Sequence, residues 1–144
     1  MTNIKPRVVR ALKDARTRLR DAAAAAHANA AATRDRCADE VRDEHESLEA
    51  ALDDAAGTLA EARTVHELDR VAESTGVYRL AVADASERHA TAAAASQTTA
   101  EQLRARTRQL RTAERLVELV DGHHAKREAR AEQHGSDDLA ARRR

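Results

Sequence analysis

The sequence predicts an all-α fold in which two long helices form an antiparallel coiled-coil hairpin with a short turn near residues 73–77. The 144 residues are dominated by Ala and Arg, 35% of them are charged, and there is a single proline. This composition is typical of a long helix or a coiled coil. The chain has one Tyr and neither Trp nor Phe, so it lacks the side chains for a thick globular core. We therefore expect one domain over residues 1–144.

A repeating stripe in the second half carries the coiled-coil prediction. Small and apolar residues recur there in alternating steps of four and three, the spacing of the a and d positions along a coiled-coil contact. The stripe comprises Tyr78, Val82, Ala85, His89, Ala92, Ser96, Thr99, Leu103, Arg106, Leu110, Ala113, Val117, Val120 and His124. A stripe of this length needs a second helix to cover it.

The first helix is predicted over about residues 5–72. Pro6 suits its start, because the N–H that proline lacks would have no partner in a first turn. The expected stripe runs through Val8, Leu12, Ala15, Leu19, Ala22 and Ala26, then Cys37, Val41, Glu44 and Leu48, and then Leu52, Ala55, Leu59, Ala62 and His66. Two shifts of phase separate these groups, and we interpret them as stutters that relax a supercoil without ending the helix.

The predicted turn rests on the segment Glu73-Ser74-Thr75-Gly76. Gly76 can adopt a positive φ and end a helix, and Ser74 or Thr75 can cap the next one. The second helix is then expected over about residues 77–134. Gly135 and Ser136 are expected to break it before a short C-terminal tail, 135–144. This turn would place Leu48 opposite Thr99 and Leu59 opposite His89.

Charge is distributed unevenly along the predicted hairpin. Residues 1–20 hold seven basic side chains and one acid, whereas residues 35–73 hold thirteen acids and four arginines. The end that carries both termini would thus be basic, and the end near the turn acidic. Few large apolar partners are expected in this register for Ile4, Val8, Val9, Leu12 and Leu19. An uncovered apolar stripe among basic residues favours a protein partner. A frayed terminus or self-association between two hairpins would also account for them.

The sequence gives little support for catalysis, for a bound metal or cofactor, or for a membrane span. Seven histidines are present, but His123 and His124 are neighbours on a helix and point about 100° apart, so we expect no metal site. A two-helix hairpin offers no enclosed pocket, so we expect no catalytic residue, no cofactor and no small-molecule substrate. No apolar run is long enough to span a membrane. The lone Cys37 fits a reducing compartment.

The C-terminal stretch resembles a known family. The run Lys126-Arg127-Glu128-Ala129-Arg130-Ala131-Glu132-Gln133-His134, followed by Asp137-Asp138-Leu139-Ala140-Ala141-Arg142, is similar to the ending of the FliJ/YscO-type stalk proteins of type III secretion. In that family a Lys usually stands at the position of His134, and the helix continues where this chain has Gly135-Ser136. The length and the plan of two long helices also agree.

The resemblance implies a cytoplasmic, non-catalytic stalk at the base of a secretion apparatus. Such a stalk inserts the end carrying both termini into a hexameric export ATPase, contacts the export gate protein, and in some members binds secretion chaperones. The resemblance does not distinguish a flagellar from an injectisome system. The residues of the implied ATPase-facing end are Arg7, Val8, Arg10, Leu12, Arg16, Arg127, Arg130, Glu132 and Gln133.

Two other classes of function remain open from the sequence. One is a coiled-coil scaffold or chaperone unrelated to secretion, including a parallel dimer. The other is a nucleic-acid-binding helical protein, which the basic segments Arg7–Arg20 and Arg104–Arg115 would favour. The lack of stacking aromatics and the acidic half of the chain weigh against it, so we expect no nucleic-acid partner.

Overall fold

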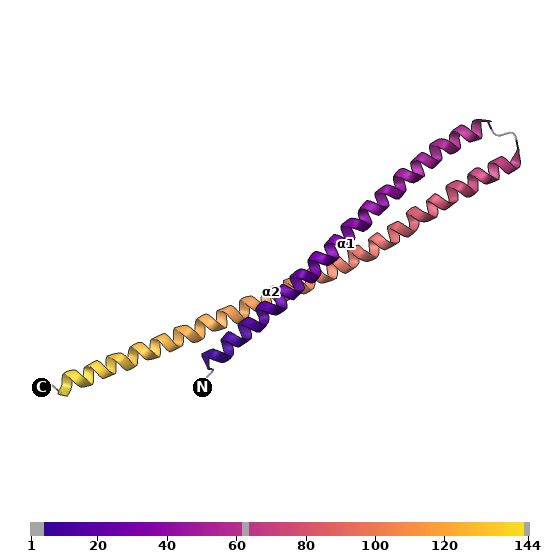
Figure 1. Cartoon of the computed structure of the whole chain (residues 1–144). Helices are drawn as coiled ribbons and strands as arrows, with labels where there is room; N and C mark the ends of the chain where they lie inside the picture. Colours follow the sequence, from indigo (N-terminus) through magenta and orange to yellow (C-terminus); the bar gives the residue numbers. More distant parts are fainter. Residues whose placement is uncertain (1–4, 62–63, 143–144) are drawn as a thin grey trace. The chain divides into compact units, whose positions relative to one another are not determined.

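Two long helices packed against each other make up the fold, which confirms the predicted all-α class (Figure 1). In this computed structural model, α1 spans Pro6–Glu61 and α2 spans Val65–Arg142. The structure describes residues 5–61 and 64–142, and the side chains as far as residue 135. Pro6 is the first helical residue, as predicted, and the Val8 backbone N–H donates to the carbonyl of Lys5 at 2.9 Å.

The break between the helices lies between Glu61 and Val65, so the predicted turn at residues 73–77 is wrong. Thr64 and Glu67 form a capping box at the start of α2. The Thr64 backbone N–H donates to Glu67 Oε2 at 3.0 Å, and the Glu67 N–H donates to Thr64 Oγ1 at 3.3 Å. These bonds satisfy backbone donors that a helix start leaves free.

Residues 73–77 are helical because Gly76 does not need to end a helix. A glycine inside a helix costs about 1 kcal/mol relative to alanine, which a long packed helix can absorb. No glycine among residues 5–61 and 64–142 has a positive φ. Leu68, Val71 and Thr75 also continue the α2 stripe towards the N-terminus in the same steps of three and four. The continuous phase therefore favoured a helix across the segment where we predicted a turn.

The predicted helix boundaries change accordingly. The first helix ends at Glu61 rather than near residue 72, and the second begins at Val65 rather than near residue 77. The second helix also passes through Gly135 and Ser136 and ends at Arg142, so the predicted tail at 135–144 is helical over its described part. Residues 143–144 of that tail, Ala62 of the predicted stripe, and Ile4 lie outside the described residues.

The chain divides into two units, which are described separately. The terminal unit combines the segment up to Ala24 with the segment from Gln102 onward, and the turn unit is Ala25–Glu101. In the terminal unit, Arg10 pairs with Asp121 and Arg16 bonds Gln109. In the turn unit, Glu40 pairs with Arg88 and His27 bonds Thr99. As the number of one partner rises the other falls, so the segments run antiparallel within each unit.

These contacts also replace the predicted register. The sequence placed His89 opposite Leu59, whereas the structure pairs the neighbouring Arg88 with Glu40. The predicted register was wrong because it depended on the position of the turn. Moving the turn from residues 73–77 to the segment before Val65 shifts every opposite pair.

The stripe predicted in the second half is confirmed as the face of α2 that packs on α1. Every residue of the stripe from Val82 to His124 is buried or half-buried, and only Tyr78 is exposed. Ala85 is fully buried, and Ala113 and Ser96 are nearly so. We call these residues, with Val71 and Thr75, the α2 seam.

The seam of α1 differs from the prediction over its first half. Val8, Leu12, Ala15, Leu19, Ala22 and Ala26, the predicted stripe, are all exposed. Apart from half-buried Pro6, Thr17, Ala24 and Ala31, the buried and half-buried residues instead follow one unbroken alternation of four and three, so the two predicted stutters are absent from this helix. This α1 seam comprises Val9, Lys13, Arg16, Arg20, Ala23, His27, Ala30, Arg34, Cys37, Val41, Glu44, Leu48, Ala51 and Ala55. We had assigned the seam to the largest apolar side chains of the first half of α1. The structure instead buries the residues that continue the spacing of Cys37, Val41 and Leu48 towards the N-terminus.

The core consists mostly of small side chains. The buried apolar residues are Val9, Ala55, Ala85, Ala92, Leu110 and Ala113, and Thr75 and Ser96 are buried with them. Alanine removes little apolar surface from water, so each such contact stabilises the pair less than a buried leucine would. The larger apolar side chains of this molecule lie mainly outside the core, on faces described below.

Candidate protein-binding faces

Two interhelical ion pairs, one in each unit, each define one side of that unit. Arg10 directly follows the seam residue Val9, and its partner Asp121 directly follows Val120; Arg10 Nη2 lies 3.0 Å from Asp121 Oδ1. Residues that follow seam residues therefore share one side in the terminal unit. In the turn unit, Glu40 and Arg88 each directly precede a seam residue, and their charged groups lie 2.8 Å apart. Within the turn unit, residues that precede seam residues therefore share one side.

An apolar–basic face lies on the preceding side of the terminal unit. Its five apolar members each stand directly before a seam residue, and their exposures run from 40% to 65%: Val8, Leu12, Leu19, Leu116 and Leu119. Exposed Arg18 and Arg115 stand directly before Leu19 and Leu116, and exposed Arg108 stands directly before Gln109; Glu118 stands in the same way before Leu119. The pairs Arg10–Asp121 and Arg16–Gln109 bracket Leu12 on α1 and Leu116 on α2, so these two leucines lie at a similar level of the helix pair. Both helices thus contribute exposed apolar residues to this side of the unit.

The acids of the terminal unit lie on the other side. Each acid among its described side chains directly follows a position in the seam phase: Asp14, Asp21, Glu114, Glu118, Asp121, Glu128 and Glu132. Among the described side chains of this unit, no carboxylate therefore stands directly before a seam residue, and Glu118 is the acid next to a member of the face, Leu119. A surface that gathers aliphatic side chains beside arginines is suited to a partner that is both apolar and acidic.

The predicted ATPase-facing residues of α1 divide among three positions. Val8 and Leu12 lie on the apolar–basic face, with 61% and 40% of their surface exposed. Arg7 and Arg10 lie on the opposite side, where Arg10 pairs with Asp121. Arg16 is half-buried in the seam, and its Nη1 donates to Gln109 Oε1 at 2.7 Å. The structure thus does not gather these five residues onto one face.

The predicted residues of α2 lie on its C-terminal extension. Arg127, Arg130, Glu132 and Gln133 are exposed, as is every described side chain from residue 125 to 135. Figure 1 shows α2 continuing past the first turn of α1. His124 is the last half-buried seam residue, so the pairing with α1 ends near it.

Leu116 and Leu119 are the residues of the face that the sequence reasoning missed. The predicted site took its apolar members from α1 alone. The signal was present, because each leucine directly precedes a residue of the correctly predicted stripe, Val117 or Val120. Large side chains immediately beside a seam on both helices indicate a second contact surface.

A smaller acidic face lies near the turn. Leu52, Leu59 and Val65 occupy following positions in the turn unit, with 39%, 47% and 74% of their surface exposed. Exposed carboxylates border them on both helices: Glu49, Asp53, Asp69 and Glu73. Like the apolar–basic face, this acidic face combines exposed aliphatic side chains with charged neighbours, but here the neighbours are carboxylates.

The two units as wholes show the same opposition of charge. Counted over the sequence, the terminal unit holds 18 basic and nine acidic residues, a formal charge of +9. The turn unit holds seven basic and 16 acidic residues, a formal charge of −9. The net charge of zero for the chain therefore hides two strongly and oppositely charged units.

A shallow groove of about 370 Å³ lies between the helices of the turn unit, lined by Ala51, Asp54, Ala55, Thr58, Glu67, Arg70, Val71 and Ser74. Two of its polar side chains bond to the backbone: Thr58 Oγ1 donates to the Asp54 carbonyl, and Glu67 belongs to the capping box. No His or Cys lines it. Across the described residues, no three His, Cys, Asp or Glu side chains are grouped to hold a metal ion.

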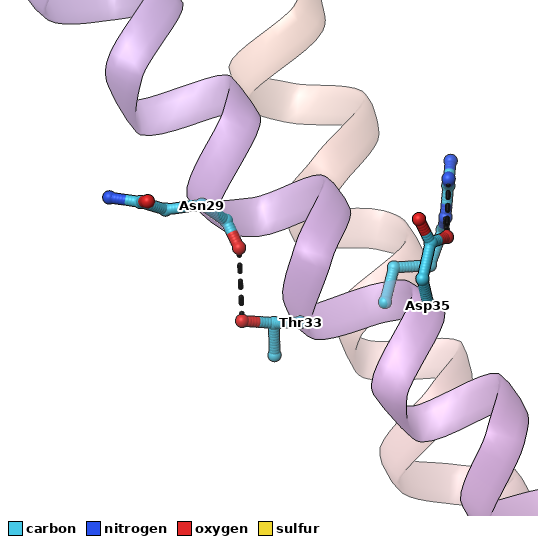
Figure 2. A network of polar contacts seen from close by, with 4 residues as sticks. Asn29, Thr33 and Asp35 are labelled. Carbon is cyan, nitrogen blue, oxygen red and sulfur yellow. Dashed lines mark hydrogen bonds and ion pairs between the residues drawn. The ribbon is translucent and has the colours of Figure 1, made fainter.

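Polar side chains elsewhere on α1 mostly bond within their own helix. Figure 2 shows Thr33 Oγ1 donating to the Asn29 carbonyl at 3.0 Å, beside a contact to Asp35. Asp35 accepts from the Nε and Nη2 of Arg34. Such exposed local pairs contribute little to stability. Exposed apolar side chains also occur outside the two faces, at Leu68, Val77 and Leu80.

Comparison with known proteins identifies no relative: no protein-family model, curated sequence or solved structure matches the chain. In the described part of the chain, no helix has an apolar stretch that could cross a membrane.

Proposed function

We propose that this chain is a non-catalytic coupling protein that binds partner proteins through its terminal unit, as a stalk of a type III secretion ATPase. The observation that carries the proposal is the apolar–basic face. Five aliphatic side chains, 40–65% exposed, stand there directly before seam residues, where the unit has no described acid. Isolated exposed leucines need no explanation, but five exposed aliphatic residues on the same side of two helices favour a partner.

The identity of the partner comes from the resemblance of the C-terminal stretch to the stalk family. Two features of the fold are compatible with it. The helices pack as an antiparallel pair, and α2 continues through Gly135 and Ser136 to Arg142. In this proposal the terminal unit engages a hexameric secretion ATPase in the cytoplasm at the base of the apparatus. Further contacts to an export gate protein or to secretion chaperones belong to the same proposal.

The proposed mechanism is mechanical. Binding of the apolar–basic face of the terminal unit favours one conformation of the ATPase subunits over another. A ligand shifts such an equilibrium only by its difference in affinity for the two conformations. The face provides that difference if its leucines are covered in one conformation only.

The test is ATP turnover and hexamer assembly of the export ATPase from the same organism, measured with and without this protein. We expect stimulation by the wild type and its loss in the double variant Val8→Glu, Leu12→Glu. The matched control is Val77→Glu, Leu80→Glu, since these residues of the turn unit are also exposed, at 66% and 72%. Unchanged turnover and assembly on adding the wild type would contradict the proposal.

A scaffold or chaperone unrelated to secretion is the second candidate. The acidic face near the turn favours it, because a protein with two chemically distinct apolar faces can hold two different partners. The same ATPase assay separates the candidates. A scaffold would leave turnover unchanged while the Val8→Glu, Leu12→Glu variant still lost a protein partner.

A further inference from the structure

We propose that, when no ATPase occupies it, the apolar–basic face binds the acidic face of a second copy of this chain. The protein would then self-associate by docking unlike faces, terminal unit of one copy onto turn unit of another. This inference goes beyond the proposed function. It rests on the geometry and charge of the two faces, so it can be tested with the purified protein in the absence of an ATPase.

The first step is that both faces have unmet apolar area of the same kind. The apolar–basic face presents five exposed aliphatic side chains from two helices, and the acidic face presents Leu52, Leu59 and Val65, also from two helices. Neither contains an aromatic ring. Within α1, Val8, Leu12, Ala15 and Leu19 follow the steps of four and three that a further helix packs against.

The second step is that charge selects unlike pairing. Arg18 and Arg115 border one face, and Glu49, Asp53, Asp69 and Glu73 border the other. Two copies of the apolar–basic face would oppose arginine to arginine in units of formal charge +9. Docking onto a unit of charge −9 instead places each basic border beside an acidic one, which steers association and disfavours like pairing.

The third step is that a helical protein fits the apolar–basic face better than a lipid surface or nucleic acid. Membrane-surface helices use Trp or Phe on a wide apolar face, and single-stranded nucleic acids stack on aromatics, none of which this face has. Its leucines lie at coiled-coil spacing instead. The complementary acidic helices that such a face requires are present in the chain itself.

The experiment is sedimentation equilibrium of the purified full chain over a range of concentrations and salt. We expect association that weakens at least about tenfold between roughly 0.05 M and 0.5 M salt, since ionic screening shortens from about 14 Å to 4 Å. A monomer at every concentration and salt would overturn the proposal. So would association that salt leaves unchanged.

Two face variants and their mixture give the sharper test. Val8→Glu with Leu119→Glu disables the apolar–basic face, and Leu59→Lys with Val65→Lys disables the acidic face. Each variant alone should be monomeric, because it keeps only one face. Mixed, they should form a one-to-one pair through the two faces that remain intact. Circular dichroism of each variant checks that its helix content is unchanged.

The control pair is Val77→Glu with Leu80→Glu, which carries the same charge change at residues as exposed as Val8 and Leu119. It should associate like the wild type. Self-association by either face variant alone would show like-to-like pairing and overturn the proposal. A mixture that stayed monomeric would overturn it equally. Failure to stimulate an ATPase bears on none of these outcomes.

Discussion

Arg20 occupies a position in the α1 seam, where an apolar residue would be usual. Its Nη2 pairs with Asp21 Oδ1 at 2.9 Å, but its Nε is buried and has no hydrogen-bond partner. A buried donor without a partner costs about 1–3 kcal/mol, and the neighbouring ion pair is too exposed to offset much of that. Lys13 and Arg16 make the same stretch of seam polar.

We therefore predict that Arg20→Leu stabilises the protein. The free energy of unfolding should rise by about 1–2 kcal/mol, because the unpaired donor is removed and apolar area is buried in its place. Urea unfolding followed by circular dichroism measures the change. Arg18→Leu serves as the control, since Arg18 is exposed outside the seam and its replacement should have little effect. A less stable Arg20→Leu variant would show that the guanidinium contributes to packing.

Side-chain size decided which seam residues the sequence could reveal. Along α2 the stripe from Val82 to His124 was predicted correctly, because we found no second apolar stripe with the same spacing beside it. Along α1 two stripes at the same spacing lie side by side, and the one with Val8, Leu12 and Leu19 is the more apolar. The structure buries the other stripe. Hydrophobicity alone could not separate a packing face from a candidate binding face.

At the scale of the helices, Gly76 tests where the hairpin turns. A Cβ added at Gly76 would meet nothing within 4 Å, and no described glycine has a positive φ. We predict that Gly76→Ala raises the free energy of unfolding by about 1 kcal/mol, the difference in helix propensity. Thermal or urea unfolding measures it, with Gly57→Ala as a second helical site of the same kind. Destabilisation would instead fit a turn at residues 73–77 in which glycine needs a positive φ.

The turn could have been located from the sequence by a different signal. Thr64 followed by Glu67 is the Thr-x-x-Glu pattern of a capping box, and both of its hydrogen bonds are formed. We predicted the turn at residues 73–77 because Gly76 can adopt the backbone conformation that a turn requires. A capping box does more, since its side chains satisfy the backbone donors of a new helix. The two helices could be predicted from the sequence. Their lengths could not, because the prediction preferred a glycine that allows a turn to a capping box that stabilises the start of a helix.

Across the whole molecule, burial predicts a gradient of local stability. Side chains 125–135 are all exposed, whereas Ala85, Ala92, Leu110 and Ala113 are buried in their own units. We predict that backbone amides after His124 exchange with solvent fastest among the helical residues, because no α1 residue packs on them and short unpacked helices are marginal in water. Hydrogen exchange measured by mass spectrometry at low protein concentration tests this. Strong protection over 125–135 would mean that something covers the extension.

The candidate faces could be predicted from the sequence only in part. The basic and acidic halves of the chain were visible, and Val8 and Leu12 were singled out. The pairing of Leu116 and Leu119 with them was not, because it depends on which side of each seam a residue occupies. That side becomes known only when contacts such as Arg10 with Asp121 and Glu40 with Arg88 fix the orientation of both helices.

The alanine seam has a mechanical consequence. Ala85 and Ala92 are buried one heptad apart in the turn unit. Alanine has no rotamers to freeze and no branches to interlock with the facing helix. Around these alanines, the two helices of the turn unit should therefore resist a small lengthwise shift less than a pair lined with leucines would.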